Sequence, residues 1–185
     1  MQIERCRFQP CRPARVEMRN SSMEGATFDR ADLRNADLSN SNLSNSSACN
    51  ALFIRANLRS AKLNGTNLCD SHLNDANMIK ADLSGARLES ASADGFTVIN
   101  LANMEAANLS GAAMRNISAE DTNFKHADLR GADLSHAVMG GASLRSSNVA
   151  GTNFKGVELA TVNMEFANFS QALNADIPSY KTNLR

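Results

Sequence analysis

Residues 26–45 read ATFDR ADLRN ADLSN SNLSN, which is four consecutive units of five residues. Each unit begins with a small residue, continues with a polar one and has Leu or Phe third, a position that we call the centre. The pattern runs on as ANLRS, AKLNG, TNLCD, SHLND, ANMIK, ADLSG and ARLES over residues 56–90. The chain has 185 residues and one repeating unit, so it is predicted to form a single repeat array.

The period of five excludes an amphipathic helix. A helix turns about 100° per residue, so a five-residue step rotates each centre by about 140° and no apolar face forms. In a short strand, the first and third residues of a unit point to one side and the second points to the other. The last two residues, as in Asn64-Gly65 and Ser84-Gly85, are typical of turns. We therefore predict a chain that turns every five residues around a core of first and third side chains.

The units resemble those of the pentapeptide repeat family, A(D/N)Lxx, over about Phe8 to Phe169. The resemblance implies an all-β fold, a right-handed quadrilateral β-helix in which four units complete one coil and residues twenty apart stack. We expect about eight coils with short caps, residues 1–172 forming the solenoid and 173–185 a C-terminal cap. One column of stacked centres is predicted to be Met18, Leu38, Leu58, Met78 and Val98, and a polar ladder to be Asn108, Asp128, Asn148 and Asn168.

The spacing of the centres changes once. From Val98 to the next centre, Met104, it is six residues instead of five. The sequence thus predicts one extra residue near 99–101, with no long loop between coils. This slip is either a tolerated insertion that bends the rod or a functional hinge. The residues assigned to it are Phe96, Ile99, Asn100 and Leu101.

Apolar residues at outward positions are the candidate interaction surface, because the faces of such a rod are otherwise polar. Ile79 and Ile99 each follow a centre and are twenty residues apart, so they are expected to stack on one face, with Ile54 on the adjacent face. Phe166 and Tyr180 are expected at the C-terminal end. An uncapped last coil is apolar, so this end is the predicted homodimer contact.

The cysteines and the apolar segments indicate a compartment. The start, MQIERCRFQP, has no apolar stretch of signal-peptide length, and no apolar run approaches a membrane span. We expect a cytoplasmic protein that does not enter a membrane. Cys49 and Cys69 both follow a centre and are twenty apart, so they are expected to stack within disulfide reach. In a reducing cytoplasm, free thiols are favoured over the bridge.

Enzymatic chemistry is not predicted. His126 and His136 are ten residues apart, which places them two corners round the coil, where they cannot share a substrate. The recurrent Asp residues are a product of the ADL unit. The chain shows no phosphate-binding glycine loop, Ser-His-Asp arrangement or metal-ligand spacing. We therefore assign no catalytic residue, no metal and no cofactor.

Three functions remain to be weighed. The first is a scaffold that binds another protein, whose identity the sequence does not reveal. The second is a regulator of type II topoisomerases, because the resemblance extends to family members that protect DNA gyrase from quinolones. Those members imitate acidic DNA, whereas this chain has 19 basic and 19 acidic residues, with arginines crowded before residue 20. The third, nucleic-acid binding by the arginine-rich end, is disfavoured because interleaved aromatic residues are missing.

Overall fold

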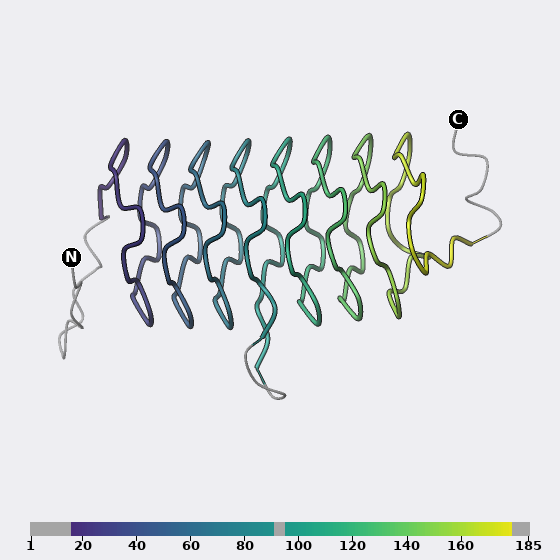
Figure 1. The fold of residues 1–185 in the computed structure, drawn as a ribbon, viewed down its shortest axis with the longest axis horizontal. Helices are drawn as coiled ribbons and strands as arrows, with labels where there is room; N and C mark the ends of the chain where they lie inside the picture. Colours follow the sequence, from purple (N-terminus) through teal and green to yellow (C-terminus); the bar gives the residue numbers. More distant parts are fainter. Residues whose placement is uncertain (1–15, 91–94, 179–185) are drawn as a thin grey trace.

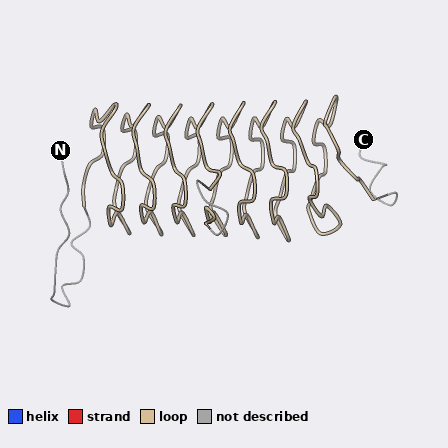
Figure 2. Ribbon diagram, turned by 60° about the horizontal axis from the view of Figure 1, so that its bottom comes forward, coloured by secondary structure: helices blue, strands red, loops and turns tan. Residues whose placement is uncertain are grey.

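A computed structural model describes residues 16–90 and 95–178, which wind into a long four-sided coil (Figure 1). The outward residue of each unit pairs in parallel with the residue one coil later, as Glu17 does with Asp37 and Asp37 with Asn57. Around the last pair, the Leu38 N–H donates to the Asn57 carbonyl at 2.8 Å and the Asn57 N–H to the Ala36 carbonyl at 2.8 Å. The described residues contain no helix (Figure 2), and each described unit except 157–161 contributes a single paired residue to the ladders.

The units stack in four columns, which form the four faces of the rod. The first face carries eight units, which agrees with the expected number of coils. We number the faces in chain order and call the last two residues of each unit the edge that follows its face. The faces run from units 16–20 to 162–166, 21–25 to 167–171, 26–30 to 152–156 and 31–35 to 157–161.

The edges are possible because the last residue of nearly every described unit adopts a positive φ, the exceptions being Ser90 and Thr161. Asn40 has φ 55° and Asp75 φ 57°, in the left-handed region that Asn, Asp and Gly tolerate best. The edges also join the ladders, since the Asn40 N–H donates to the Arg59 carbonyl at 2.9 Å. The prevalence of Asn, Asp and Gly at the end of the unit therefore has a backbone cause.

First and third side chains fill the interior, as predicted. Where a centre is small, the next one is large: Ala48 is followed by Phe53 and Ala119 by Phe124, and all four are fully buried. Such alternation keeps the packing volume of a coil nearly constant. Buried Thr side chains in the first position bond to the adjacent coil, as the Thr66 hydroxyl does to the Leu43 carbonyl at 2.8 Å.

The predicted one-residue slip is wrong. Val98 pairs with His72, and the next pairs across this region also span 26 residues instead of 20. The chain therefore leaves the coil after residue 90, regains it at Thr97 and inserts six residues, one whole unit plus one residue. Insertions of one and six residues shift a five-residue pattern equally, so the spacing of the centres cannot distinguish them. The inserted segment is six residues long, so it does not contradict the expectation that no long loop separates the coils.

The insertion changes the register of the residues that follow it. Val98 is an outward residue and not a centre, and Ile99 is the buried centre of a regular unit, 97–101. Met104, not Val98, continues the column that contains Met78, because Asn77 pairs with Asn103. Asn100 and Leu101 form the edge of that regular unit. The ladder ends where Leu173 pairs with Asn153.

Candidate interaction surface

The residues predicted as contact points do not come together. Ile99 is fully buried, so its assignment to the surface is wrong. Ile54 and Ile79 are half-buried and lie on different edges, after the fourth and first faces. Phe166 is 59% exposed, and the Arg145 guanidinium lies 5.7 Å from the centre of its ring. Tyr180 lies outside the described residues.

A different apolar surface lies on the fourth face. Outward residues of the first two faces are all polar, whereas the fourth face carries Leu52, Val98 and Val138 at this position. Val138 is 54% exposed and Leu52 is half-buried, whereas Val98 is only 7% exposed and is therefore covered. The sequence prediction considered apolar residues that directly follow a centre, and these side chains are instead the second residues of their units. Testing the second residue of each unit would have found Leu52 and Val138 in the sequence.

Two further apolar side chains flank Val98. Phe96 precedes the unit and is 54% exposed, and Leu101 ends it and is 58% exposed. Leu101 has φ 61°, an uncommon conformation for Leu, which projects its side chain at the edge after the fourth face. Three of the five large apolar side chains that are exposed in the described residues thus belong to this part of the rod: Phe96, Leu101 and Val138.

The carboxylates of this surface lack basic partners. The four units of the fourth face from residue 97 onward contain Glu120, Asp121 and Glu158 but no Lys, Arg or His. Within the described residues, none of the three forms an ion pair. Glu120 accepts a hydrogen bond from the Asn100 amide at 3.2 Å, and Glu158 from the Ala160 N–H at 2.9 Å.

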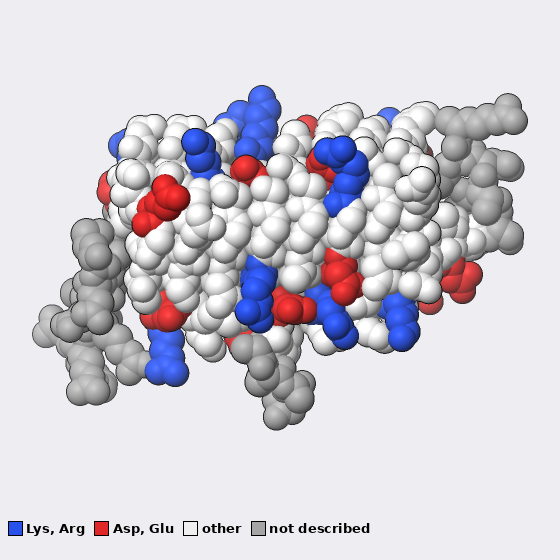
Figure 3. Space-filling view, viewed as in Figure 1, with Lys and Arg blue, Asp and Glu red and all other residues white. Residues whose placement is uncertain are grey.

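The first half of the same face is electrically balanced. Arg34 pairs with Asp32 at 2.6 Å and Arg55 with Asp75 at 3.6 Å. The two halves therefore differ in charge. We call the second half, with the exposed apolar residues Phe96, Leu101 and Val138 and the carboxylates Glu120, Asp121 and Glu158, the fourth-face patch. The side displayed in Figure 3 differs again, because basic and acidic residues are interspersed on it.

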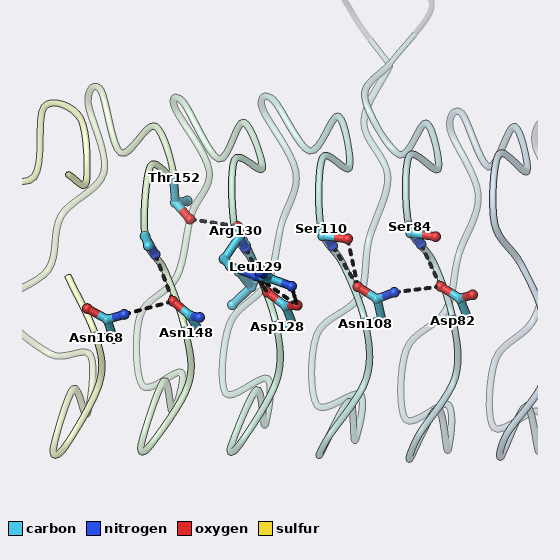
Figure 4. Close-up of polar contacts among 11 residues, drawn as sticks. Asp82, Ser84, Asn108, Ser110, Asp128, Leu129, Arg130, Asn148, Thr152 and Asn168 are labelled. Atoms are coloured by element: carbon cyan, nitrogen blue, oxygen red, sulfur yellow. Dashed lines mark hydrogen bonds and ion pairs between the residues drawn. The ribbon is translucent and has the colours of Figure 1, made fainter. Parts of the chain in front are cut away.

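The predicted polar ladder is present on the second face (Figure 4). The Asn108 amide donates to Asp82 at 3.0 Å and the Asn168 amide to Asn148 at 3.1 Å. Asp128 instead binds Arg130, whose Nη2 lies 2.6 Å from a carboxylate oxygen. This hydrogen bond outweighs partial burial and lowers the pKa of Asp128. Internal bonds thus occupy much of the ladder, as expected of a stabilising element.

Catalytic geometry is not evident in the described residues. His126 and His136 lie on edges after opposite faces, and no cluster of three His, Cys, Asp or Glu side chains in this part of the chain could hold a metal ion. A shallow cavity of about 460 Å³ lies beside Phe28, but its carboxylate, Asp29, already accepts the Cys49 N–H at 2.9 Å. The absence of enzymatic activity stays a prediction.

Cys49 and Cys69 stack as predicted, on the edge after the third face. Their Cα atoms are 4.7 Å apart and the structure joins them in a disulfide, where the sequence favoured free thiols. Stacking of adjacent coils brings the two residues to this distance without any special loop, since strands in a ladder lie about 4.8 Å apart.

No helix among the described residues is long and apolar enough to cross a membrane.

Comparison with known proteins agrees with this architecture. The family model for pentapeptide repeats matches eight copies over residues 14–47, 51–89, 102–141 and 139–173. The chain belongs to the pentapeptide repeat family. The matched segments omit residues 90–101, where the structure places the insertion. No curated protein matches the chain by sequence.

Solved structures of the family show the same fold, the right-handed quadrilateral β-helix. A trypsin-treated variant of QnrB1, a plasmid-mediated fluoroquinolone resistance protein, is 16% identical with a TM-score of 0.60, and the match covers 93% of this chain and 82% of that one. HetL, involved in heterocyst differentiation regulation in the cyanobacterium Nostoc sp. strain PCC 7120, is 29% identical over 87% of this chain and 84% of its own, with a TM-score of 0.33.

Proposed function

We propose that this pentapeptide repeat protein is a non-enzymatic scaffold that binds another protein through the fourth-face patch. The observation that carries the proposal is the grouping of Phe96, Leu101 and Val138, each more than half exposed, at one part of the rod. The other two large apolar side chains that are exposed in the described residues, Phe166 and Leu173, lie near the C-terminal end. Exposed apolar groups that are rimmed by charge mark interaction sites more often than scattered ones do. The rod is rigid, so its partner would meet a preformed surface.

Affinity capture with matched variants tests this function. Val138→Glu places a charge in the patch, and Ile79→Glu places the same charge on the edge after the first face. We expect a protein captured by the wild type and by Ile79→Glu to be lost with Val138→Glu. If the same proteins bind all three, the patch is not the binding surface. We expect the protein in the cytoplasm, as the sequence predicts, so a cytoplasmic extract is the source in which to search for the partner.

Regulation of a type II topoisomerase is a second candidate, and the charge of the rod favours it. The described residues contain 13 Lys and Arg against 17 Asp and Glu, so the rod itself is acidic. The whole chain is balanced because the residues outside these ranges contain six Lys and Arg against two Asp and Glu. The sequence disfavoured DNA imitation because the charge of the whole chain is balanced and no long loop is inserted between coils. The described residues change only the first of these premises, since the insertion is six residues long.

DNA supercoiling by purified gyrase tests this candidate. The protein is titrated with and without a quinolone. Inhibition, or protection from the drug, at micromolar protein would favour topoisomerase binding. No effect over this range would remove the second candidate and leave the scaffold function.

A further inference from the structure

We propose that Cys49 and Cys69 form a thiol–disulfide exchange site for small anionic thiols of the glutathione class, in which the external thiol reacts with Cys49 and Cys69 resolves the product. The inference is independent of the proposed scaffold function. Three observations support it: the unequal burial of the two cysteines, the cavity beside one of them and the charges on either side of the pair.

The two cysteines differ in their access to solvent. Cys69 is 4% exposed, whereas Cys49 is half-buried. Thiol–disulfide exchange requires contact between the attacking sulfur and the sulfur that is attacked, so access selects the site of reaction. An external thiol therefore reaches Cys49 more readily than Cys69.

The cavity lies on the Cys49 side of the pair. Its lining is formed by residues 27–31 of the first coil and by Cys49 and Asn50 of the next, and does not include Cys69. Its volume of about 460 Å³ is within the range of sites for small ligands, about 300–1,000 Å³. A small thiol that enters from the first coil thus arrives beside Cys49.

The cavity offers such a thiol a cationic group. Arg30 is exposed and forms no ion pair with the residues in 16–90 and 95–178. The neighbouring carboxylate, Asp29, instead accepts the Cys49 N–H at 2.9 Å and the Ser47 hydroxyl at 2.5 Å. The Arg30 guanidinium is therefore available to a carboxylate of the incoming thiol, and glutathione carries two.

The Cys69 side of the pair carries more negative charge. Asn67 pairs with Arg87, so Glu89 lies one layer beyond Cys69. Asp70 follows Cys69 directly, and its Oδ1 is buried without a hydrogen-bond partner among the described residues. Arg87 offsets part of this charge, at 3.9 Å from the Glu89 carboxylate. A thiolate that approaches Cys69 meets two carboxylates, which disfavours its approach.

The exchange proceeds in two steps. The thiolate of glutathione attacks the Cys49 Sγ, the disulfide bond breaks, and Cys69 leaves as a thiolate that takes a proton from water. A second glutathione thiolate attacks the sulfur of the bound glutathione and releases the Cys49 thiolate and glutathione disulfide. Two external thiols are oxidised while the protein disulfide is reduced. In the reverse direction, Cys69 expels glutathione from Cys49, which the Cα separation of 4.7 Å permits.

Partial reduction of the wild type identifies the sulfur that is attacked. The protein is treated with glutathione, quenched with iodoacetamide and digested with trypsin, which separates Cys49, in peptide 35–55, from Cys69, in peptide 63–80. Mass spectrometry should find glutathione on Cys49 and alkylation on Cys69, in preference to the reverse by about ten to one or more. Equal amounts of the two products, or a preference for glutathione on Cys69, would overturn the inference.

Single-cysteine chains test the reverse direction. Cys6 and Cys11 are replaced by Ser in all of them, and circular dichroism verifies the fold of each. Reduced Cys69→Ser, which keeps Cys49, should react with glutathione disulfide about tenfold faster or more than Cys49→Ser, which keeps Cys69. Similar rates, or a faster reaction of Cys49→Ser, would contradict the proposed order of attack.

The role of Arg30 has its own control. In the chain that keeps Cys49, Arg30→Met should slow the reaction with glutathione disulfide about threefold or more, and leave that with the neutral bis(2-hydroxyethyl) disulfide unchanged. Arg59→Met removes an exposed arginine on the opposite edge and should change neither rate. Equal slowing of both reagents by Arg30→Met, or the same effect from Arg59→Met, would exclude recognition of the anionic thiol by Arg30.

Discussion

Val98 pairs with His72 although 26 residues separate them, whereas the pairs on either side of this region span 20. Deleting residues 91–96 should therefore join two intact ladders. Ser90 would then end its unit, a place with positive φ that Ser60 and Ser146 already occupy. We expect the deletion to change the free energy of unfolding by about 0.5 kcal/mol or less, as at sites away from core and ladder.

A single-residue deletion provides the contrast. Removing Asn100 shortens a regular unit. It also removes a side chain that accepts hydrogen bonds from the Ser118 hydroxyl and the Glu120 N–H and donates one to the Glu120 carboxylate. We expect a loss of at least about 2 kcal/mol, in the range for disrupted hydrogen-bond networks. Chemical denaturation followed by circular dichroism measures both variants. A stable variant without Asn100 and an unfolded one without 91–96 would restore the one-residue slip.

Alanine substitution separates Ile99 from Ile79. Ile99 is fully buried, so Ile99→Ala should cost about 2–5 kcal/mol through lost apolar contacts and the cavity that remains. Ile79 is half-buried on an edge, and its substitution should cost less than about 1 kcal/mol. Urea denaturation gives both values. Similar costs for the two variants would contradict the register assigned after the insertion.

The disulfide should stabilise the first coils. Cys49 and Cys69 close a segment of 20 residues, for which chain entropy gives about 3 kcal/mol. We expect a reductant to lower the Tm of the wild type and to leave Cys49→Ser/Cys69→Ser unchanged. Mass spectrometry of protein alkylated at once after cell lysis reports which state exists in the cell. Two alkylated thiols there would show that the bridge forms only on oxidation.

Acid should remove the stabilisation that Arg130 gives. Its hydrogen bond lowers the pKa of Asp128 below that of the unfolded chain. The contribution is therefore present at neutral pH and is lost as pH falls below about 4, through the lowered pKa. The difference in Tm between pH 7 and pH 3 should be smaller in Arg130→Met than in the wild type. Lys125→Met removes a charge that forms no ion pair with the residues in 16–90 and 95–178, and it should keep the wild-type difference.

Phe166 tests the predicted contact at the C-terminal end. Phe166 is 59% exposed, and Leu173, in the last ladder pair, is 54% exposed, so apolar surface is available there. If two rods pair through this end, Phe166→Ser should convert dimer to monomer. Phe96→Ser removes an equally exposed ring elsewhere and serves as control. Sedimentation equilibrium gives the masses, and an unchanged mass for Phe166→Ser would exclude this contact.

The sequence by itself determined the coil and most of its columns. A unit of five with fixed small, polar and large positions assigns inward and outward side chains without reference to distant residues. This is why Phe53 and Leu129 are buried as predicted, why Asn108 and Asp128 stack, and why Cys49 meets Cys69. Each follows from local alternation and a constant coil length.

Only the tertiary structure decided where the inserted residues leave the coil and which residues form the candidate site. One extra residue and six extra residues displace a five-residue pattern equally, so periodicity cannot distinguish them. The hydrogen bonds between Val98 and the coil below distinguish them, because they require Thr97 and Ile99 to point inward. Those bonds turn Ile99 into the core and Val98 outward, and thereby place Phe96, Leu101 and Val138 on one side of the rod.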